Sequence, residues 1–390
     1  MTTPSSSSAA VRRAVIENAR SVVVKVGTRV LTTEEGKLDR RRIDLLAAQL
    51  CRIADTGRQT LMVSSGAVGA GLGKLGLDQR PLGLAQLQAI AAIGQTDLIQ
   101  AYEFSLAAMG RHAAQVLLTA ADLRRRSGYL NVRNALSQIH AFGSIAIINE
   151  NDSVAVSELM TTFGDNDRLA AQVAGLLSDA ILIILSDVDG LYDGPPTDPS
   201  SRRLEIVDMI DDKIMAMAQG HQDVHSKGGM ASKLEAAQVA TSHGQPTIIA
   251  PGRDDQVLDK IFSEVPIGTL FLPPEKSIRG RRRWIGSAAR VSGSLLLDAG
   301  AAAAVCKKGS SLLAIGITKV TGSFQRGSVV SLHDPSGQEI ARGLCNYPSS
   351  EVEKIIGQPS DKISEILGHR PYENVVHRDN LVMIADTNRT

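Results

Sequence analysis

The run Ile181-Leu182-Ile183-Ile184-Leu185, followed at once by Ser186-Asp187, decides the fold class of this 390-residue chain. Five aliphatic residues without polar alternation are typical of a parallel strand that helices cover on both faces. Further short apolar runs lie at residues 22–24, 61–63, 116–118, 145–148 and 247–249. Apolar residues spaced three and four apart predict helices between them, at residues 43–55, 81–108, 131–140 and 169–177. The sequence therefore predicts an α/β fold, a three-layer sandwich with a mostly parallel central sheet.

The pattern changes near residue 275. Basic residues without any acid occupy the stretch Lys276–Arg290, and Pro273-Pro274 precede it as a linker. Short apolar runs broken by Gly and Ser follow, at residues 295–297, 312–315, 329–332 and 339–341. Such runs predict a small β-barrel-like domain. We therefore predict a flexible tail over residues 1–15, a large α/β domain over residues 16–274, and a linker with the small domain over residues 275–390.

The composition excludes several classes of protein. The 42 Lys and Arg residues balance 41 Asp and Glu residues, so the chain as a whole has no basic surface for non-specific nucleic-acid binding. The longest β-type apolar run, Ile181–Leu185, is far shorter than the roughly 20 residues that span a bilayer. Cys51, Cys306 and Cys345 lie far apart and form no CxxC pair, which predicts reduced thiols in a cytoplasmic protein.

Polar residues follow four of the apolar runs, where ligands bind in an open α/β sheet. Each group by itself is typical of a turn or a helix cap. Because the carboxyl ends of parallel strands share one edge of the sheet, the four groups together predict a ligand site there. These groups are Lys25 with Gly27, Ser64 with Ser65, Asn149 to Asp152, and Ser186 with Asp187.

Two further segments predict a phosphate site. Gly228 and Gly229 precede a helix that has Lys233 in its first turn, so backbone N–H groups and an ammonium group can face an anion. With Lys25 elsewhere, this predicts a phosphate cradle made from two loops. The acidic segment Asp165-Asn166-Asp167 either caps the next helix or holds lysine ammonium groups and helps to ligate Mg²⁺.

The common nucleotide and metal signatures do not fit. No P-loop sequence is present, and the G-x-G-x-x-G at Gly71–Gly76 starts eight residues beyond Val63, too late for a dinucleotide turn. We predict a loop role for these glycines. His221 and His225 have a spacing of four but lack the Glu of H-E-x-x-H, so they do not indicate a metal site.

A reaction class follows from the lysines and from the absence of a histidine base in these motifs. Lysines, glycines and helix N-termini suit phosphoryl transfer, in which positioning and charge neutralisation lower the barrier. A carboxylate acceptor is ionised at pH 7 and needs no general base. Glu150, Asp152 and Asp165 would repel a bare anion, so the acceptor should also carry an ammonium group. An amino acid satisfies both conditions.

These motifs resemble the glutamate 5-kinase family of the amino acid kinase superfamily. The resemblance runs in order from Lys25 to Lys233 and includes N-E-N-D at Asn149–Asp152 and G-D-N-D at residues 164–167. The C-terminal part resembles a PUA domain, with Arg282-Arg-Trp284, Lys308-Gly-Ser-Ser and Val320-Thr-Gly as its cues.

The resemblance implies ATP-dependent phosphorylation of the γ-carboxylate of L-glutamate, the first step towards proline, with Mg²⁺. It implies that Lys25 and Lys233 contact the transferring phosphoryl group and that Asp167 orients them. Glutamate would bind to Ser65, Asn149, Asp152 and Asn166. ATP would bind to Lys25, Gly27, Ser186, Asp187, Lys227, Gly228, Gly229, Met230, Ala231, Ser232 and Lys233. Mg²⁺ would be carried mainly by ATP, with Asp165 as a candidate ligand.

The resemblance also implies a homo-oligomer and feedback inhibition by proline. Two alternatives stay open: a sister kinase that acts on aspartate or N-acetylglutamate, and an RNA-binding regulatory protein that uses the PUA-like domain and the basic stretch Lys276–Arg290. One departure from the family pattern concerns the ATP loop. Ser226-Lys227 stand where the family usually has Gly-Thr, which adds a positive charge beside the phosphates.

Overall fold

The computed structural model describes residues 6–33, 36–124, 126–154, 166–219, 229–274, 291–369 and 372–384. The chain divides into two compact units, the first made of Met1–Arg125 with Asn131–Ser277 and the second of Arg126–Leu130 with Ile278–Thr390. Among the helices in the described part of the chain, none is long and apolar enough to cross a membrane.

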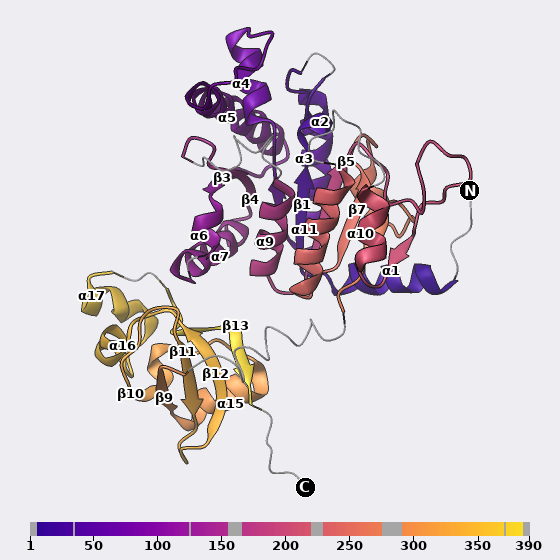
Figure 1. The fold of residues 1–390 in the computed structure, drawn as a ribbon. Coiled ribbons are helices and arrows are strands. Elements are labelled where there is room, and N and C mark those ends of the chain that lie inside the picture. Colours follow the sequence, from indigo (N-terminus) through magenta and orange to yellow (C-terminus); the bar gives the residue numbers. More distant parts are fainter. Residues whose placement is uncertain are drawn as a thin grey trace. The chain divides into compact units, whose positions relative to one another are not determined.

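The first unit is built on an eight-stranded sheet with the order β3-β4-β2-β1-β5-β7-β8-β6 (Figure 1). Neighbouring strands are parallel except for β7 and β8. Each apolar run of the sequence lies in one of these strands, so the prediction of a mostly parallel sheet is confirmed. The strands are β1 Ser21–Val26, β2 Gln59–Val63, β3 Ala113–Leu118, β4 Ile145–Glu150, β5 Ala180–Ser186, β6 Ile206–Val207, β7 Thr247–Pro251 and β8 Thr269–Phe271.

Helices connect the strands and cover both faces of the sheet. Helix α3 packs against β2, and α9 packs against β1 and β5 with α11 beside it (Figure 1). The helices are α2 Thr28–Leu31, α3 Arg40–Asp55, α4 Ala67–Leu75, α5 Leu84–Ala107, α6 Ala120–Arg124, α7 Arg126–Ala141, α9 Asn166–Leu176, α10 Asp212–Gln219, α11 Met230–Ser242 and α12 Val257–Phe262.

Alternation along β1 decides which side of the sheet Lys25 reaches. Val22, Val24 and Val26 belong to one hydrophobic core, together with residues of α3, α5 and α12. Because successive side chains of a strand point to opposite faces, Val23 and Lys25 point to the other face. That face is covered by α9 and α11.

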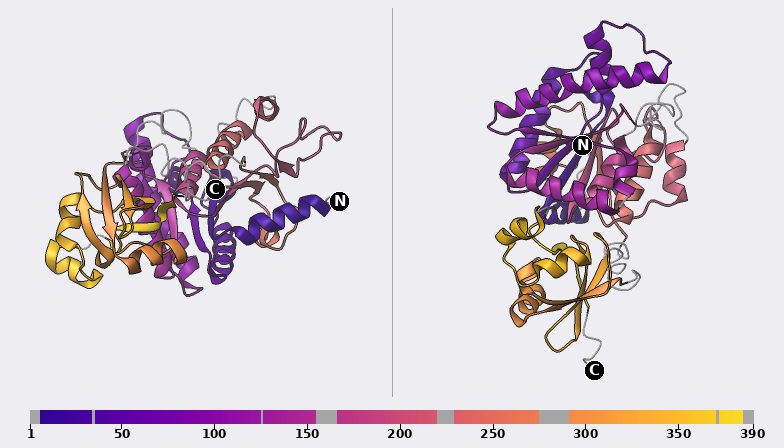
Figure 2. Two further views of the ribbon diagram at one scale, coloured as in Figure 1. Left: turned by 90° about the horizontal axis from the view of Figure 1, so that it is seen from below. Right: turned by 90° about the vertical axis from the view of Figure 1, so that its left-hand side faces the viewer.

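Part of the predicted flexible tail over residues 1–15 is helical, which corrects that prediction. Helix α1 spans Ser6–Asn18 (Figure 2). Its Arg12 is buried and donates to the carbonyls of Ile267 at 3.0 Å, Gly268 at 2.8 Å and Glu205 at 2.7 Å. Burial lowers the pKa of Arg12 to about 10, with the charge of Arg203 acting in the same direction. No sequence pattern indicates this anchor, because its partners are backbone carbonyls distant along the chain.

The glycines of Gly71–Gly76 do not form a loop as predicted. Gly71 and Gly73 lie within α4, and Gly76 caps its C-terminus with a φ of 65°. A Cβ at Gly71 would lie 2.1 Å from the carbonyl oxygen of Ile90 on α5. A Cβ at Gly94 on α5 would lie 1.9 Å from the carbonyl oxygen of Ala67. The two helices thus cross with their backbones in close contact, which only glycine permits at these two positions.

The second unit has its own five-stranded sheet, with the order β10-β9-β11-β12-β13. The run at residues 312–315 is not a strand: Leu312 makes an isolated bridge to Val376, and a 3-10 turn, η2, covers Ala314–Gly316. The other predicted runs lie in strands. The elements are β9 Gly293–Leu297, α15 Ala299–Lys308, β10 Ile317–Thr321, β11 Val329–His333, β12 Glu339–Cys345, α16 Ser349–Ile355, η3 Ser360–Lys362, α17 Ile363–Leu367 and β13 Val376–Met383.

Candidate active site

The topology brings the predicted groups to one edge of the sheet. Strands β4, β2, β1, β5 and β7 are consecutive and parallel, so their carboxyl ends lie along the same edge. Lys25 on β1 stands in the middle of this row. The ends of β2 and β4 carry the predicted amino-acid residues on one side of it. The ends of β5 and β7 lie on the other side, where Ser186 is the last residue of β5 and Asp187 follows it.

Three charged side chains meet beneath the middle of this edge. The Lys25 ammonium group forms an ion pair with Asp167, and the Lys233 Nζ lies 3.7 Å from the Asp167 Oδ2. The side chains of Lys25, Lys233 and Asp167 are 5%, 8% and 1% exposed, respectively. Asp167 lies in the first turn of α9 and Lys233 in the first turn of α11, so both helix N-termini point at this cluster. The cluster carries two positive charges against one negative charge, an arrangement that favours an added anion.

The N-terminus of α11 is connected to the same carboxylate. Gly229 is the N-cap of the helix, and the Ser232 hydroxyl donates to the Gly229 carbonyl at 3.0 Å and to the Asp167 Oδ2 at 3.4 Å. Met230 and Ala231 form the intervening turn. Among the other predicted residues, Asp165, Ser226, Lys227 and Gly228 lie outside the described residues, as do His221, His225 and the whole basic stretch Lys276–Arg290.

Amide and hydroxyl groups gather on the β2–β4 side. The buried Asn166 Nδ2 donates to the Asn149 Oδ1 at 2.7 Å, to the Ser64 carbonyl at 2.5 Å and to the Ser65 hydroxyl at 3.3 Å. The Asn149 Nδ2 in turn donates to the Gln95 Oε1 at 2.7 Å. Buried amides that bond one another in this way hold their geometry, because a rotated amide would lose these hydrogen-bond partners. Three of the four predicted glutamate residues are therefore brought together.

Asp152, the fourth, lies two residues beyond the end of β4 and is half-buried. Burial raises its pKa to about 6, and the nearby charge of Arg80 acts in the opposite direction. A half-buried carboxylate of this kind is stabilised in its ionised form when a cation approaches.

Ser186 and Asp187 lie together at the end of β5. The Ser186 hydroxyl donates to the Asp187 Oδ1 at 2.9 Å, and the Arg29 Nη1 donates to the Asp187 Oδ2 at 2.8 Å. Burial alone would raise the pKa of Asp187, but the hydrogen bonds from Arg29 and Ser186 outweigh it, and the pKa is lowered. Gly27 is bonded to the same strand end, because its N–H donates to the Leu185 carbonyl at 3.3 Å.

The sequence did not indicate two residues of this site. Gln95 lies within the apolar helix α5 and belongs to no motif. The one sequence cue to its role is a polar amide among apolar neighbours, and the structure shows that this amide is buried. Because Arg29 follows Gly27-Thr28 directly, the sequence places it near the phosphate-facing loop. Nothing in the sequence indicates that Asp187 is its partner.

The described residues contain no group of three or more His, Cys, Asp or Glu side chains arranged to hold a metal ion. The carboxylate of Asp167 faces two lysines, and Asp187 faces Arg29.

Comparison with known proteins shows which families the chain matches. The amino acid kinase family matches residues 20–251, and the PUA domain matches residues 293–367. The chain is 63% identical over 374 residues to the glutamate 5-kinase of Rhodopirellula baltica, with 96% of each chain covered. It is 45% identical over 374 residues to the glutamate 5-kinase of Moorella thermoacetica, covering 96% of this chain and 98% of that one. Both similarities extend over the first and the second unit.

Proposed function

The chain belongs to the amino acid kinase family, and within it to the glutamate 5-kinases, and on that premise we propose how its residues carry out the reaction. The protein transfers a phosphoryl group from ATP to the γ-carboxylate of L-glutamate, which begins proline biosynthesis. The observation that supports the residue roles best is the buried cluster of Lys25, Asp167 and Lys233 at the centre of the sheet edge.

The cluster suits the transferring phosphoryl group. Phosphoryl transfer has a loose transition state with charge spread over the equatorial oxygens, so fixed positive charges stabilise it. Asp167 keeps the two ammonium groups in place before ATP arrives. The two lysines and the one carboxylate leave the cluster with a net charge of one positive. A γ-carboxylate oxygen of glutamate attacks the γ-phosphorus, a new P–O bond forms, and the bond to the β-phosphate oxygen breaks with its electron pair leaving on ADP. No proton is removed from the acceptor, so no general base is required.

L-Glutamate binds on the β2–β4 side in this proposal. Asp152 receives the α-ammonium group, while the Ser65 hydroxyl and the amide of Asn166 bind carboxylate oxygens. Asn149 holds Asn166 through the hydrogen bond of 2.7 Å and so acts on glutamate indirectly. An acceptor without a free ammonium group, such as N-acetylglutamate, would leave the Asp152 carboxylate without a cation.

The nucleotide binds on the β5–β7 side. Ser186, Asp187 and the turn Gly229–Lys233 contact it, and Gly27 leaves space beside the Lys25 ammonium group, since a Cβ there would lie 3.7 Å from the Nζ. Lys227 and Gly228 belong to the same proposed loop. Bound to ATP, Mg²⁺ would neutralise part of the polyphosphate charge.

A hydroxylamine assay tests this assignment. With MgATP and L-glutamate the protein should form an acyl phosphate, which hydroxylamine traps as the hydroxamate; aspartate and N-acetylglutamate should give far less product. Lys25→Ala should lower kcat by about 10²- to 10³-fold, because a preorganised charge at the transition state is lost. Lys74→Ala is the matched control, since Lys74 is an exposed lysine paired with Asp97 at 2.9 Å. Normal turnover by Lys25→Ala would refute the role of Lys25.

Inhibition by proline, a homo-oligomer and a cytoplasmic location remain part of the proposal. Adding proline to the same assay tests the first, and the mass of the protein in solution tests the second. RNA binding through the PUA domain is a separate question. A filter-binding titration at low salt would answer it.

A further inference from the structure

Arg29 occupies a place at the nucleotide edge to which the reaction above assigns no role. It lies in α2, the single helical turn that follows Gly27. Its Nη1 reaches the Asp187 Oδ2 on the neighbouring strand end at 2.8 Å, although 158 residues separate the two in sequence. The Arg29 side chain is 59% exposed and that of Asp187 is 37% exposed. The ion pair thus lies at the open edge of the sheet, beside the buried cluster of Lys25.

The backbone of Arg29 is held from a third loop. The Arg253 Nη2 donates to the Arg29 carbonyl at 2.9 Å. Arg253 belongs to the loop after β7, whose Gly252 N–H donates to the Ser186 carbonyl at 2.6 Å. The loops after β1, β5 and β7 are therefore connected through Arg29, Asp187 and Arg253.

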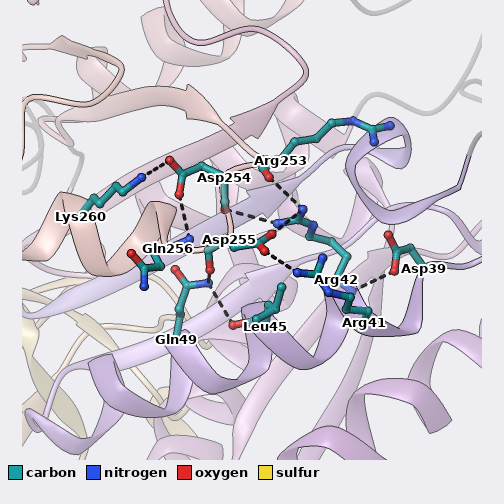
Figure 3. Close-up of polar contacts among 10 residues, drawn as sticks. All are labelled: Asp39, Arg41, Arg42, Leu45, Gln49, Arg253, Asp254, Asp255, Gln256 and Lys260. Atoms are coloured by element: carbon teal, nitrogen blue, oxygen red, sulfur yellow. Dashed lines mark hydrogen bonds and ion pairs between the residues drawn. The ribbon is translucent and has the colours of Figure 1, made fainter. Parts of the chain in front are cut away.

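Helix α3 supports the loop after β7. The buried Arg42 donates to the Arg253 carbonyl at 2.8 Å and pairs with the Asp255 carboxylate at 2.9 Å. Gln49 donates to the Asp255 carbonyl at 3.2 Å. Figure 3 shows these contacts converging on the loop, while the Arg253 side chain extends away from them. Arg42 and Gln49 thus hold the loop after β7 in place from α3. Arg29 lies at the exposed end of this set of contacts.

The charges of Arg29 and Asp187 indicate how their ion pair affects the binding of ATP. ATP carries several negative charges, and the Asp187 carboxylate lies at the edge where it binds, so an isolated Asp187 would repel the phosphates. Arg29 contributes the opposite charge and fixes the carboxylate in one orientation. Lys233 also acts on Asp187 electrostatically, from the side of the buried cluster.

We propose that Arg29 is a positioning residue of the nucleotide site, which orients and neutralises Asp187 so that this edge accepts the polyanionic nucleotide. The inference rests on the proposed function, because it assumes that ATP binds at the ends of β5 and β7. It predicts an effect on nucleotide affinity, through Asp187, and no direct effect on glutamate binding.

Kinetics and nucleotide binding by the full chain test the proposal. Arg29→Gln should raise the KM for ATP and the Kd for MgADP by about fivefold, the size expected of a partly exposed charge-assisted pair. The KM for glutamate should stay unchanged. Arg29→Lys should recover most of the affinity, since it keeps the charge. The matched control is Arg52→Gln, because Arg52 is a similarly exposed arginine that pairs with Asp259 at 2.6 Å, and its KM for ATP should match that of the wild type.

A double-mutant cycle identifies the route of the effect. If Arg29 acts through Asp187, then Arg29→Gln should change the Kd for MgADP by less than twofold when Asp187→Asn is already present. An equal effect in both backgrounds, or an unchanged KM for ATP in Arg29→Gln, overturns the proposal. These outcomes leave the proposed function intact as long as the wild type makes the hydroxamate. Inactivity of the wild type would instead refute the function itself.

Discussion

Replacing Gly94 by alanine would test how the crossing of α4 and α5 positions the amino-acid side of the site. Helix α4 follows Ser65 and Gly66 directly, and Gly94 on α5 precedes Gln95, which holds Asn149. The added methyl group would meet the Ala67 carbonyl oxygen at 1.9 Å and the Gly71 nitrogen at 2.3 Å. Both are backbone atoms, so no side-chain rotation relieves the contact.

The expected magnitude follows from these distances. An ordinary contact begins near 3.4 Å, so the carbonyl oxygen and the new carbon must separate by about 1.5 Å. Overpacking of this kind costs roughly 1–3 kcal/mol, and contact with backbone places this case at the upper end. The better helix propensity of alanine returns about 1 kcal/mol. A net loss of about 2 kcal/mol should lower the Tm of the first unit by roughly 4–8 °C.

The assay combines a thermal melt with kinetics. Because the separated helices carry Ser65 and Gln95 with them, the KM for glutamate should rise while the KM for ATP stays near the wild-type value. Gly73→Ala is the matched control on α4. Its Cβ would make only ordinary contacts with Lys37, at 3.6 Å from the side chain and 4.0 Å from the Cα, so it should leave stability unchanged or raise it by up to about 1 kcal/mol. A Tm for Gly94→Ala that equals the Tm of Gly73→Ala would refute the close crossing.

Two more predictions concern charged residues. Burial raises the pKa of Asp152 to about 6, so the carboxylate becomes protonated as the pH falls through 6 and loses its attraction for the glutamate ammonium group. The KM for glutamate should therefore rise between pH 7 and pH 5 in the wild type and vary less in Asp152→Asn; equal profiles would contradict the role of Asp152. Arg12→Ala should destabilise the first unit by roughly 2–4 kcal/mol, because three backbone carbonyls lose a buried donor. An unchanged melt of this variant, with the exposed Arg13→Ala as control, would show that α1 does not stabilise the unit.

The strands and their mostly parallel arrangement could be predicted because a parallel strand leaves a local mark in the sequence, whereas their order in the sheet was not predicted. Runs such as Ile181–Leu185 need only their own composition to be recognised, and the polar residues after them follow from the direction of the chain. Residues that support the site from a distance left no such mark. Gln95 meets Asn149 across 54 residues, and Arg29 meets Asp187 across 158. Neither pair shares a motif, since each depends on which helix or loop the fold places beside it.

The glycines illustrate the same division. The sequence shows Gly71 and Gly73 as two members of one pattern, and by itself it cannot say which of them touches another helix. Packing decides that Gly71 lies against Ile90 of α5 and that Gly73 faces outward. By itself the sequence determined the α/β class and the reaction class, and it indicated lysines and carboxylates as candidate site residues, because these depend on local patterns and on chemistry. The family resemblance implied that Asp167 orients Lys25 and Lys233, but only the tertiary structure showed the three side chains buried together, since the strands and helices that carry them meet through long-range packing alone.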